Sequence, residues 1–106
     1  MVAYEMMFIL NPELGEEEIE AALDRLQNII HQGGGEITNL DKWGKRRLAY
    51  EVRKFREGFY VLLNFRSPSA IAAEVERVVK ISDNIIRYLL IRDERAERQP
   101  ERVEKE

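Results

Sequence analysis

A basic segment near the middle of the chain carries the side chains whose chemistry is clearest. Residues 42–56 hold seven bases and one acid, although the chain of 106 residues has a formal net charge of −3. Lys and Arg neutralise phosphates, and Arg can also fork onto a base edge or stack against a base. Phosphate attraction acts over about a Debye length, roughly 8–10 Å, so the local surplus of positive charge matters more for binding than the net charge of the chain. The segment therefore predicts contact with a nucleic acid, and its bases are Lys42, Lys45, Arg46, Arg47, Arg53, Lys54 and Arg56.

The other residues that could take part in catalysis or metal binding are better explained by structural roles. The chain has no cysteine, which removes disulfides, zinc ribbons and iron–sulfur clusters. His31 is the single histidine and stands at a predicted helix end, where it is interpreted as a terminal cap and not as a base. The acids at 16–18 and 20 fit a solvated helix start better than a metal site, which needs convergent ligands. We predict no metal, no cofactor, no small-molecule substrate and no catalysis.

Six elements must position these residues. Ile19, Leu23, Leu26 and Ile30 recur at helical spacing before three glycines, and Leu48 starts the alternation typical of a half-buried strand. The first half is expected to contain a strand at Tyr4–Leu10, a helix at Glu16–Gln32 and a strand within Glu36–Lys54 that bends or bulges at Gly44. A connection at Phe55–Gly58 leads to a strand at Phe59–Arg66. A helix capped by Ser67, with Pro68 in its first position, and a strand at Ile85–Ile91 complete the order.

The order β-α-β-β-α-β predicts an α+β fold of the ferredoxin-like kind. Two split β-α-β units give a four-stranded antiparallel sheet with two helices on one face. Residues 1–92 are expected to form this domain, and residues 93–106 a charged, disordered tail. The first ten residues lack the features of a signal peptide, and no apolar run approaches the roughly 20 residues of a membrane span. We therefore expect a cytoplasmic protein without a membrane partner.

The predicted strands are apolar on both sides, which helices on one face do not explain. If Met6 and Phe8 point toward the helices, alternation sends their neighbours to the opposite face. Strands that are apolar on both sides normally have both sides covered, and a large apolar patch marks a protein-binding surface. Partial exposure, or cover by the tail or another copy, is the alternative. The predicted partner face consists of Met7, Ile9, Tyr60, Leu62, Leu89 and Ile91.

The segment Gly44–Tyr50 (GKRRLAY), followed by Val52 and Arg53, resembles the signature segment of the bacterial small-subunit ribosomal protein number six family. The resemblance covers roughly residues 1–92 and includes Tyr4-Glu5, Asn11-Pro12 and Asp83-Asn84.

What the resemblance implies is a structural role in the ribosome. That family binds the central domain of 16S ribosomal RNA as a heterodimer with the small-subunit ribosomal protein eighteen, which packs on its sheet. On the motif, Lys45, Arg46, Arg47 and Arg53 become the expected RNA contacts. Lys54 and Arg56 are added on charge alone, and Arg87 on its position in the last strand.

Two rival functions use the same fold. A free RNA-recognition-motif protein would bind single strands on exposed rings, but of the central outward positions only Tyr60 is aromatic. An acylphosphatase-like hydrolase needs backbone amides and an arginine after the first strand. Here residues 11–16 include Pro12 and two carboxylates, which would repel an anion.

Overall fold

The computed structural model describes residues 1–93. Its elements are β1 (Val2–Leu10), α1 (Glu16–Gln32), β2 (Glu36–Val52), β3 (Phe55–Ser67), α2 (Ser69–Ile81) and β4 (Ile85–Arg92). This is the predicted order. The charged tail was predicted at residues 93–106, and all of it except Asp93 lies outside the described residues.

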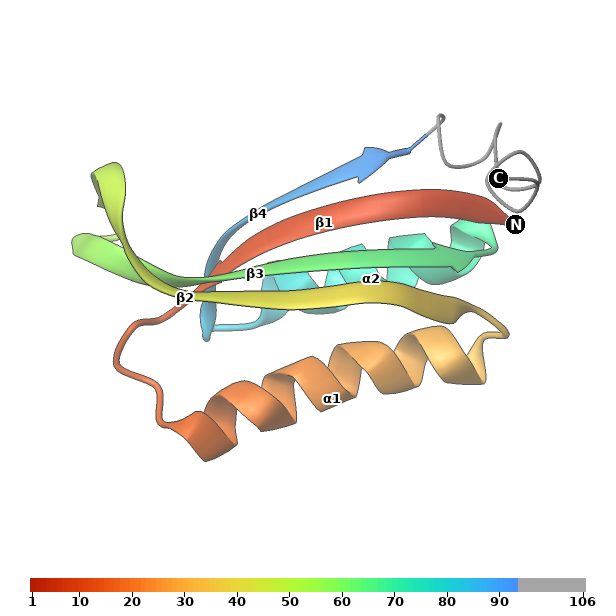
Figure 1. The fold of residues 1–106 in the computed structure, drawn as a ribbon, viewed down its shortest axis with the longest axis horizontal. Coiled ribbons are helices and arrows are strands. Elements are labelled where there is room, and N and C mark those ends of the chain that lie inside the picture. Colours follow the sequence, from red (N-terminus) through yellow and green to blue (C-terminus); the bar gives the residue numbers. More distant parts are fainter. Residues whose placement is uncertain (94–106) are drawn as a thin grey trace, which may run out of the picture.

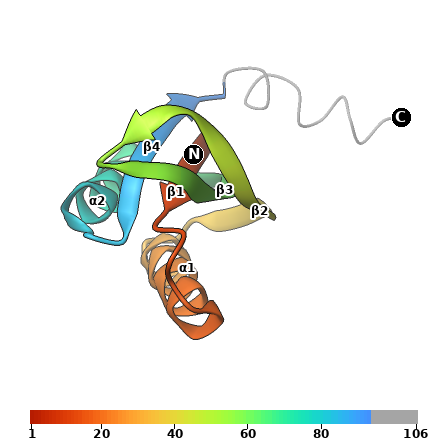
Figure 2. The same cartoon turned by 90° about the vertical axis from the view of Figure 1, so that its left-hand side faces the viewer.

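The strands form one antiparallel sheet in the order β2-β3-β1-β4, and both helices lie against the same face (Figures 1 and 2). The core fills the space between that face and the helices. Met6, Phe8 and Leu10 of β1 are fully buried there. From α1, the predicted stripe of Ile19, Leu23, Leu26 and Ile30 is buried against them. The predicted fold class is confirmed, since alternation along the strands and helical spacing along α1 meet in one core.

Two local expectations were wrong. The turn between β2 and β3 is not at Phe55–Gly58 but at Arg53 and Lys54, whose φ angles are +51° and +71°. Val52 pairs with Phe55, so the loop has two residues, and a two-residue loop of type I′ has positive φ at both. Glycine normally supplies that conformation, and this turn contains none, so the residue types did not predict it.

Ser67 is not the cap of α2. It is the fully buried last residue of β3, and its hydroxyl donates to the Pro68 carbonyl oxygen at 2.9 Å. Pro68 itself occupies the N-cap position. The strand extends one residue further than expected because Ser67 pairs with Val2 across the sheet.

The β2–β3 hairpin extends past the rest of the sheet and curls over the face that the helices leave free (Figures 1 and 2). Leu48 comes down onto Ile9 and Ile86, and these three buried residues form a second, smaller cluster. Val52, Phe55 and Tyr60 pack around it. We call the sheet surface away from the helices the outer face. One end of it is therefore covered by the chain itself.

Gly58 allows this close approach. A Cβ atom at this position would lie 2.1 Å from Cγ2 of Ile9, which is buried and attached close to the backbone. We predict that Gly58→Ala lowers the free energy of unfolding by about 1–3 kcal/mol, the usual cost of overpacking. Urea denaturation measures this loss. Gly34→Ala is the control for a glycine with no atom within 4 Å, although its positive φ adds a cost of its own. Unchanged stability in Gly58→Ala would contradict the tight contact.

Candidate nucleic-acid interface

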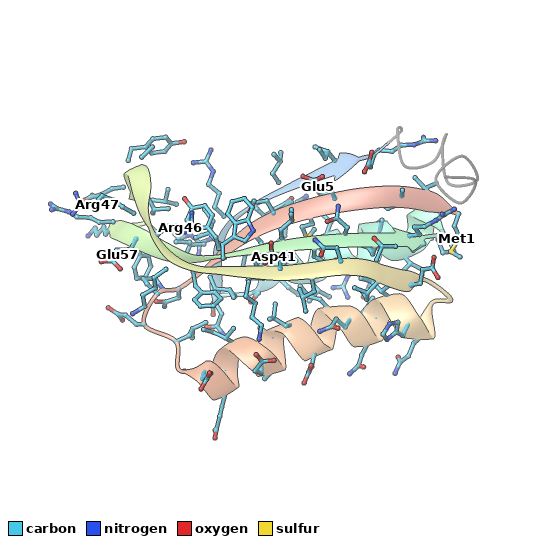
Figure 3. The ribbon with its side chains drawn as sticks, viewed as in Figure 1. Met1, Glu5, Asp41, Arg46, Arg47 and Glu57 are labelled. Carbon is cyan, nitrogen blue, oxygen red and sulfur yellow. The ribbon has the colours of Figure 1, made fainter. Side chains whose placement is uncertain are left out.

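The tip of the hairpin gathers most of the predicted RNA contacts. The six exposed side chains come from β2 (Lys45, Arg46 and Arg47), from the turn (Arg53 and Lys54) and from the second residue of β3 (Arg56). Figure 3 shows Arg47 and Glu57 at the far end of the hairpin. Two acids temper the charge: Glu51 accepts from Arg56 at 3.2 Å, and Glu57 pairs in register with Arg47. The tip remains a strongly basic, solvent-facing projection.

Arg87 comes from β4, yet the fold brings it to the same end of the molecule. Its guanidinium lies over the Tyr50 ring, 5.3 Å from the centroid, and donates a hydrogen bond to the Tyr50 hydroxyl. Tyr50 belongs to the curled part of β2, so this contact ties the hairpin to the opposite edge of the sheet. All seven predicted RNA-binding residues therefore lie on the hairpin or against it.

A bulge at Gly44 decides which way the basic side chains point. The register of β2 against β3 shifts between Lys42 and Gly44, and Gly44 has φ +87°, a conformation that suits glycine. Past the shift Arg46, not Lys45, shares the outer face with Trp43, and its guanidinium lies 5.6 Å from the Trp43 ring centroid. The predicted bulge is confirmed, and it determines that Arg46 is the cation on the face of Trp43.

The predicted partner face is partly open and partly closed. Leu89, Met7 and Leu62 pair side by side across β4, β1 and β3, and we call them the apolar row. Leu89 is 61% exposed, while Met7 and Leu62 are half-buried. Ile91 is 45% exposed beside Glu5.

Ile9 differs from its partners on this face, because it is only 8% exposed. It points to the outer face as alternation predicts, but Leu48 and Ile86 cover it. Tyr60 is half-buried against the same cluster. The expectation that Ile9 is open to a partner therefore needs correction. The chain supplies its cover.

Three residues of this region were not among the predicted site residues: Trp43, Leu48 and Tyr50. Trp43 is 39% and Tyr50 60% exposed, and an arginine guanidinium lies over each ring. The available signal was position, since both flank the basic run at 45–47. Their contacts, however, reach Tyr60 and Arg87, which are remote in sequence.

The side chains with a shifted pKa lie away from this interface. Burial, followed by a hydrogen bond to Glu76, raises the pKa of Tyr88, which packs against the helix-side core. On α2 the hydrogen bonds that Arg77 donates to Glu74, together with the attraction of their charges, lower the pKa of Glu74 and raise the pKa of Arg77. Within residues 1–93 no three acidic or histidine side chains converge as a metal site requires. No helix in that part of the chain is long and apolar enough to cross a membrane.

Comparison with known proteins decides the family. The family model described as ribosomal protein S6 matches residues 3–92. The chain belongs to the ribosomal protein S6 family. It is 54% identical to small ribosomal subunit protein bS6 of Thermoanaerobacter pseudethanolicus over 92 residues, which are 87% of this chain and 97% of that one. It is 52% identical to bS6 of Heliobacterium modesticaldum, over 87% of this chain and 96% of that one.

A solved structure agrees with these relatives. The chain matches the crystal structure of 30S ribosomal protein S6 from Thermotoga maritima with a TM-score of 0.88 and 33% identity, over 97% of each chain. Membership in the S6 family makes the chain a structural, non-enzymatic component of the small subunit of the cytoplasmic ribosome. It also replaces both rival interpretations, the free RNA-recognition-motif protein and the hydrolase.

Proposed function

We propose that this S6-family chain binds the central domain of 16S ribosomal RNA as a heterodimer with the small-subunit ribosomal protein eighteen. The observation that carries the proposal is that two surfaces of different chemistry lie on the same sheet. The basic hairpin tip projects from one end of it, and the apolar row crosses the middle of the outer face, beyond the cluster of Ile9, Leu48 and Ile86. A chain that carries both surfaces can hold an RNA and a protein at the same time.

The RNA part of the proposal rests on the tip. Six exposed cations on one hairpin suit a phosphate backbone, since each neutralised phosphate releases counterions. The tip is also held in place, by the cluster around Leu48 and by the Tyr50–Arg87 contact. Such preorganisation lowers the ordering cost of binding.

The protein part rests on the outer face. Its exposed residues Leu89 and Ile91 and the half-buried Met7 and Leu62 form an apolar surface with the acids Glu5 and Asp41 at its margin, and Figure 3 shows both acids on this side of the sheet. A hollow of about 110 Å³ beside Met7, Ile9 and Leu89 can take one apolar side chain. Interfaces with an apolar centre and a charged rim have this composition.

The RNA contact is tested by the double variant Arg46→Ala with Arg47→Ala. We expect it to bind the 16S central-domain fragment more weakly as the heterodimer, with a log-log salt slope flatter by about 1–2 units, because up to two phosphate contacts are lost. Affinities measured across a KCl series give the slope. The control, Arg25→Ala with Lys80→Ala, removes two exposed charges from the helices and should leave the slope unchanged. An unchanged slope in the first variant would exclude both arginines from the interface.

A further inference from the structure

Trp43 is held in one orientation on the outer face while much of its ring remains in water. Its indole N–H donates to Oδ2 of Asp41 at 3.1 Å. Its ring lies nearly parallel to that of Tyr60, at an interplanar angle of 11° with centroids 6.5 Å apart. The Arg46 guanidinium lies 5.6 Å from the Trp43 centroid. Three contacts therefore fix a side chain that is still 39% exposed.

The neighbours of this ring are polar at their tips and flat on their faces. Asp41 offers a carboxylate, Tyr60 a hydroxyl, and Arg46 a planar cation. A nucleobase has the complementary build, with a flat π face and an edge of donors and acceptors. An aliphatic side chain of a protein partner would use the ring face and leave those polar groups unused. The apolar row, which suits such a partner, is made of other residues.

The site also lies where an RNA strand would arrive. Trp43 directly precedes the bulge at Gly44, and past the bulge Arg46 returns to the same face. A strand whose phosphates are held by the hairpin cations thus passes over the aromatic pair at the base of the hairpin. The sequence offered only Tyr60 as an outward ring. The fold adds a second, parallel one from the neighbouring strand.

We infer that Trp43, supported by Tyr60 and Arg46, is a stacking site for one unpaired nucleobase of the bound RNA. This inference rests on the proposed function, because the hairpin must first bind RNA. It goes further in naming the ligand group, a base that lies outside a helix, and a residue that recognises it through its π face. Stacking of this kind tolerates any base, so the site selects for an unpaired nucleotide and not for its sequence.

Trp43 is the single tryptophan of the chain, which makes its fluorescence a reporter of this site. The test titrates the heterodimer with the 16S central-domain fragment and subtracts the signal of the Trp43→Phe heterodimer, so that any tryptophan of the partner cancels. We expect the RNA to quench the Trp43 emission. The opposite result is that the partner protein alone quenches the emission fully and RNA causes no further change. That result would assign the ring to the protein interface and overturn the inference.

Affinities give the second measurement. Trp43→Ala should bind the fragment about tenfold more weakly, the order expected for the loss of one base–aromatic stack, while its salt slope stays that of the wild type. Trp43→Phe should retain most of the affinity, because it keeps a ring. Replacing the unpaired bases of the fragment one at a time by abasic nucleotides should reveal one position at which Trp43→Ala no longer has an effect.

Failure of the inference and failure of the proposed function look different in this design. Salt-dependent binding of the fragment by wild type, with Trp43→Ala equal to it and no quenching, would overturn the stacking site and leave the proposed function standing. No salt-dependent binding by the wild-type heterodimer would overturn both. Thermal melting of Trp43→Ala is the check on folding, and Trp43→Phe, which preserves the packing against Tyr60, keeps the test decisive if the alanine variant melts early.

Discussion

The double variant Leu62→Asp with Leu89→Asp should fold and yet lose the proposed protein partner. The two leucines flank Met7 in the apolar row, one from β3 and one from β4. Burying each large apolar side chain contributes roughly 1.5–3 kcal/mol, before the costs of association are subtracted. Losing both should weaken the heterodimer by about 3–6 kcal/mol, or roughly 150- to 20,000-fold in Kd. Isothermal titration with the purified partner measures this change.

Folding of this variant should survive because neither leucine belongs to the helix-side core. Leu89 is 61% exposed, and Leu62 is half-buried on the outer face. The matched control is Ile81→Asp with Ala73→Asp, which adds two charges to exposed positions of α2 and should bind the partner like the wild type. Wild-type affinity in the Leu62, Leu89 variant would refute the interface. A variant that no longer melts cooperatively would instead place Leu62 in the core.

The sequence predicted the layered fold because its evidence is local. Ile19, Leu23 and Leu26 recur at helical spacing, and Met6 and Phe8 alternate with their neighbours. The spacing within each element therefore predicts which of its faces is buried. The glycines at 33–35 end α1 where predicted, because glycine suits the end of a helix and disfavours its continuation. Gly44 likewise marked its bulge. These signals need no knowledge of what lies across the sheet.

The outer face could not be predicted in the same way. Alternation places Ile9 on that face, but it does not tell whether a segment almost forty residues later folds over it. Leu48 does so because β2 and β3 continue beyond the other strands and twist, as paired strands do. The Trp43–Tyr60 stack and the Tyr50–Arg87 contact follow from the same curl and from a register shift. Both contacts join residues that are remote in sequence, so residue types and local spacing did not reveal them.

The second large effect concerns the anchor of the hairpin. Leu48 is 9% exposed and joins Ile9 and Ile86 in the small outer cluster. Truncating a buried leucine to alanine costs about 2–5 kcal/mol, and a peripheral site belongs at the lower end. We expect Leu48→Ala to lower the free energy of opening the hairpin by about 2 kcal/mol, which raises the population of the open form roughly thirtyfold. Hydrogen exchange of the amides at 45–58 should speed up accordingly.

The exchange pattern tells where Leu48 acts. The outer cluster is separate from the helix-side core, so the amides of β1 that pair with β3 near Met6 should keep their protection in Leu48→Ala. Ile81→Ala, an exposed aliphatic position on α2, should leave both regions unchanged. Faster exchange along all four strands would show that the two clusters unfold together and would contradict a separately anchored hairpin.

RNA binding should follow hairpin closure. Apparent affinity scales with the fraction of molecules in the binding-competent state, so a hairpin that is open in a larger fraction of molecules binds more weakly although every cation is still present. The affinity of Leu48→Ala for the 16S fragment should therefore fall while its salt slope remains close to that of the wild type, the reverse of the pattern expected for Arg46→Ala with Arg47→Ala. Adding Arg87→Ala to Leu48→Ala removes the Tyr50 tie as well, and exchange at the tip should speed up again. Equal exchange in the single and double variants would mean that Leu48 alone holds the hairpin down.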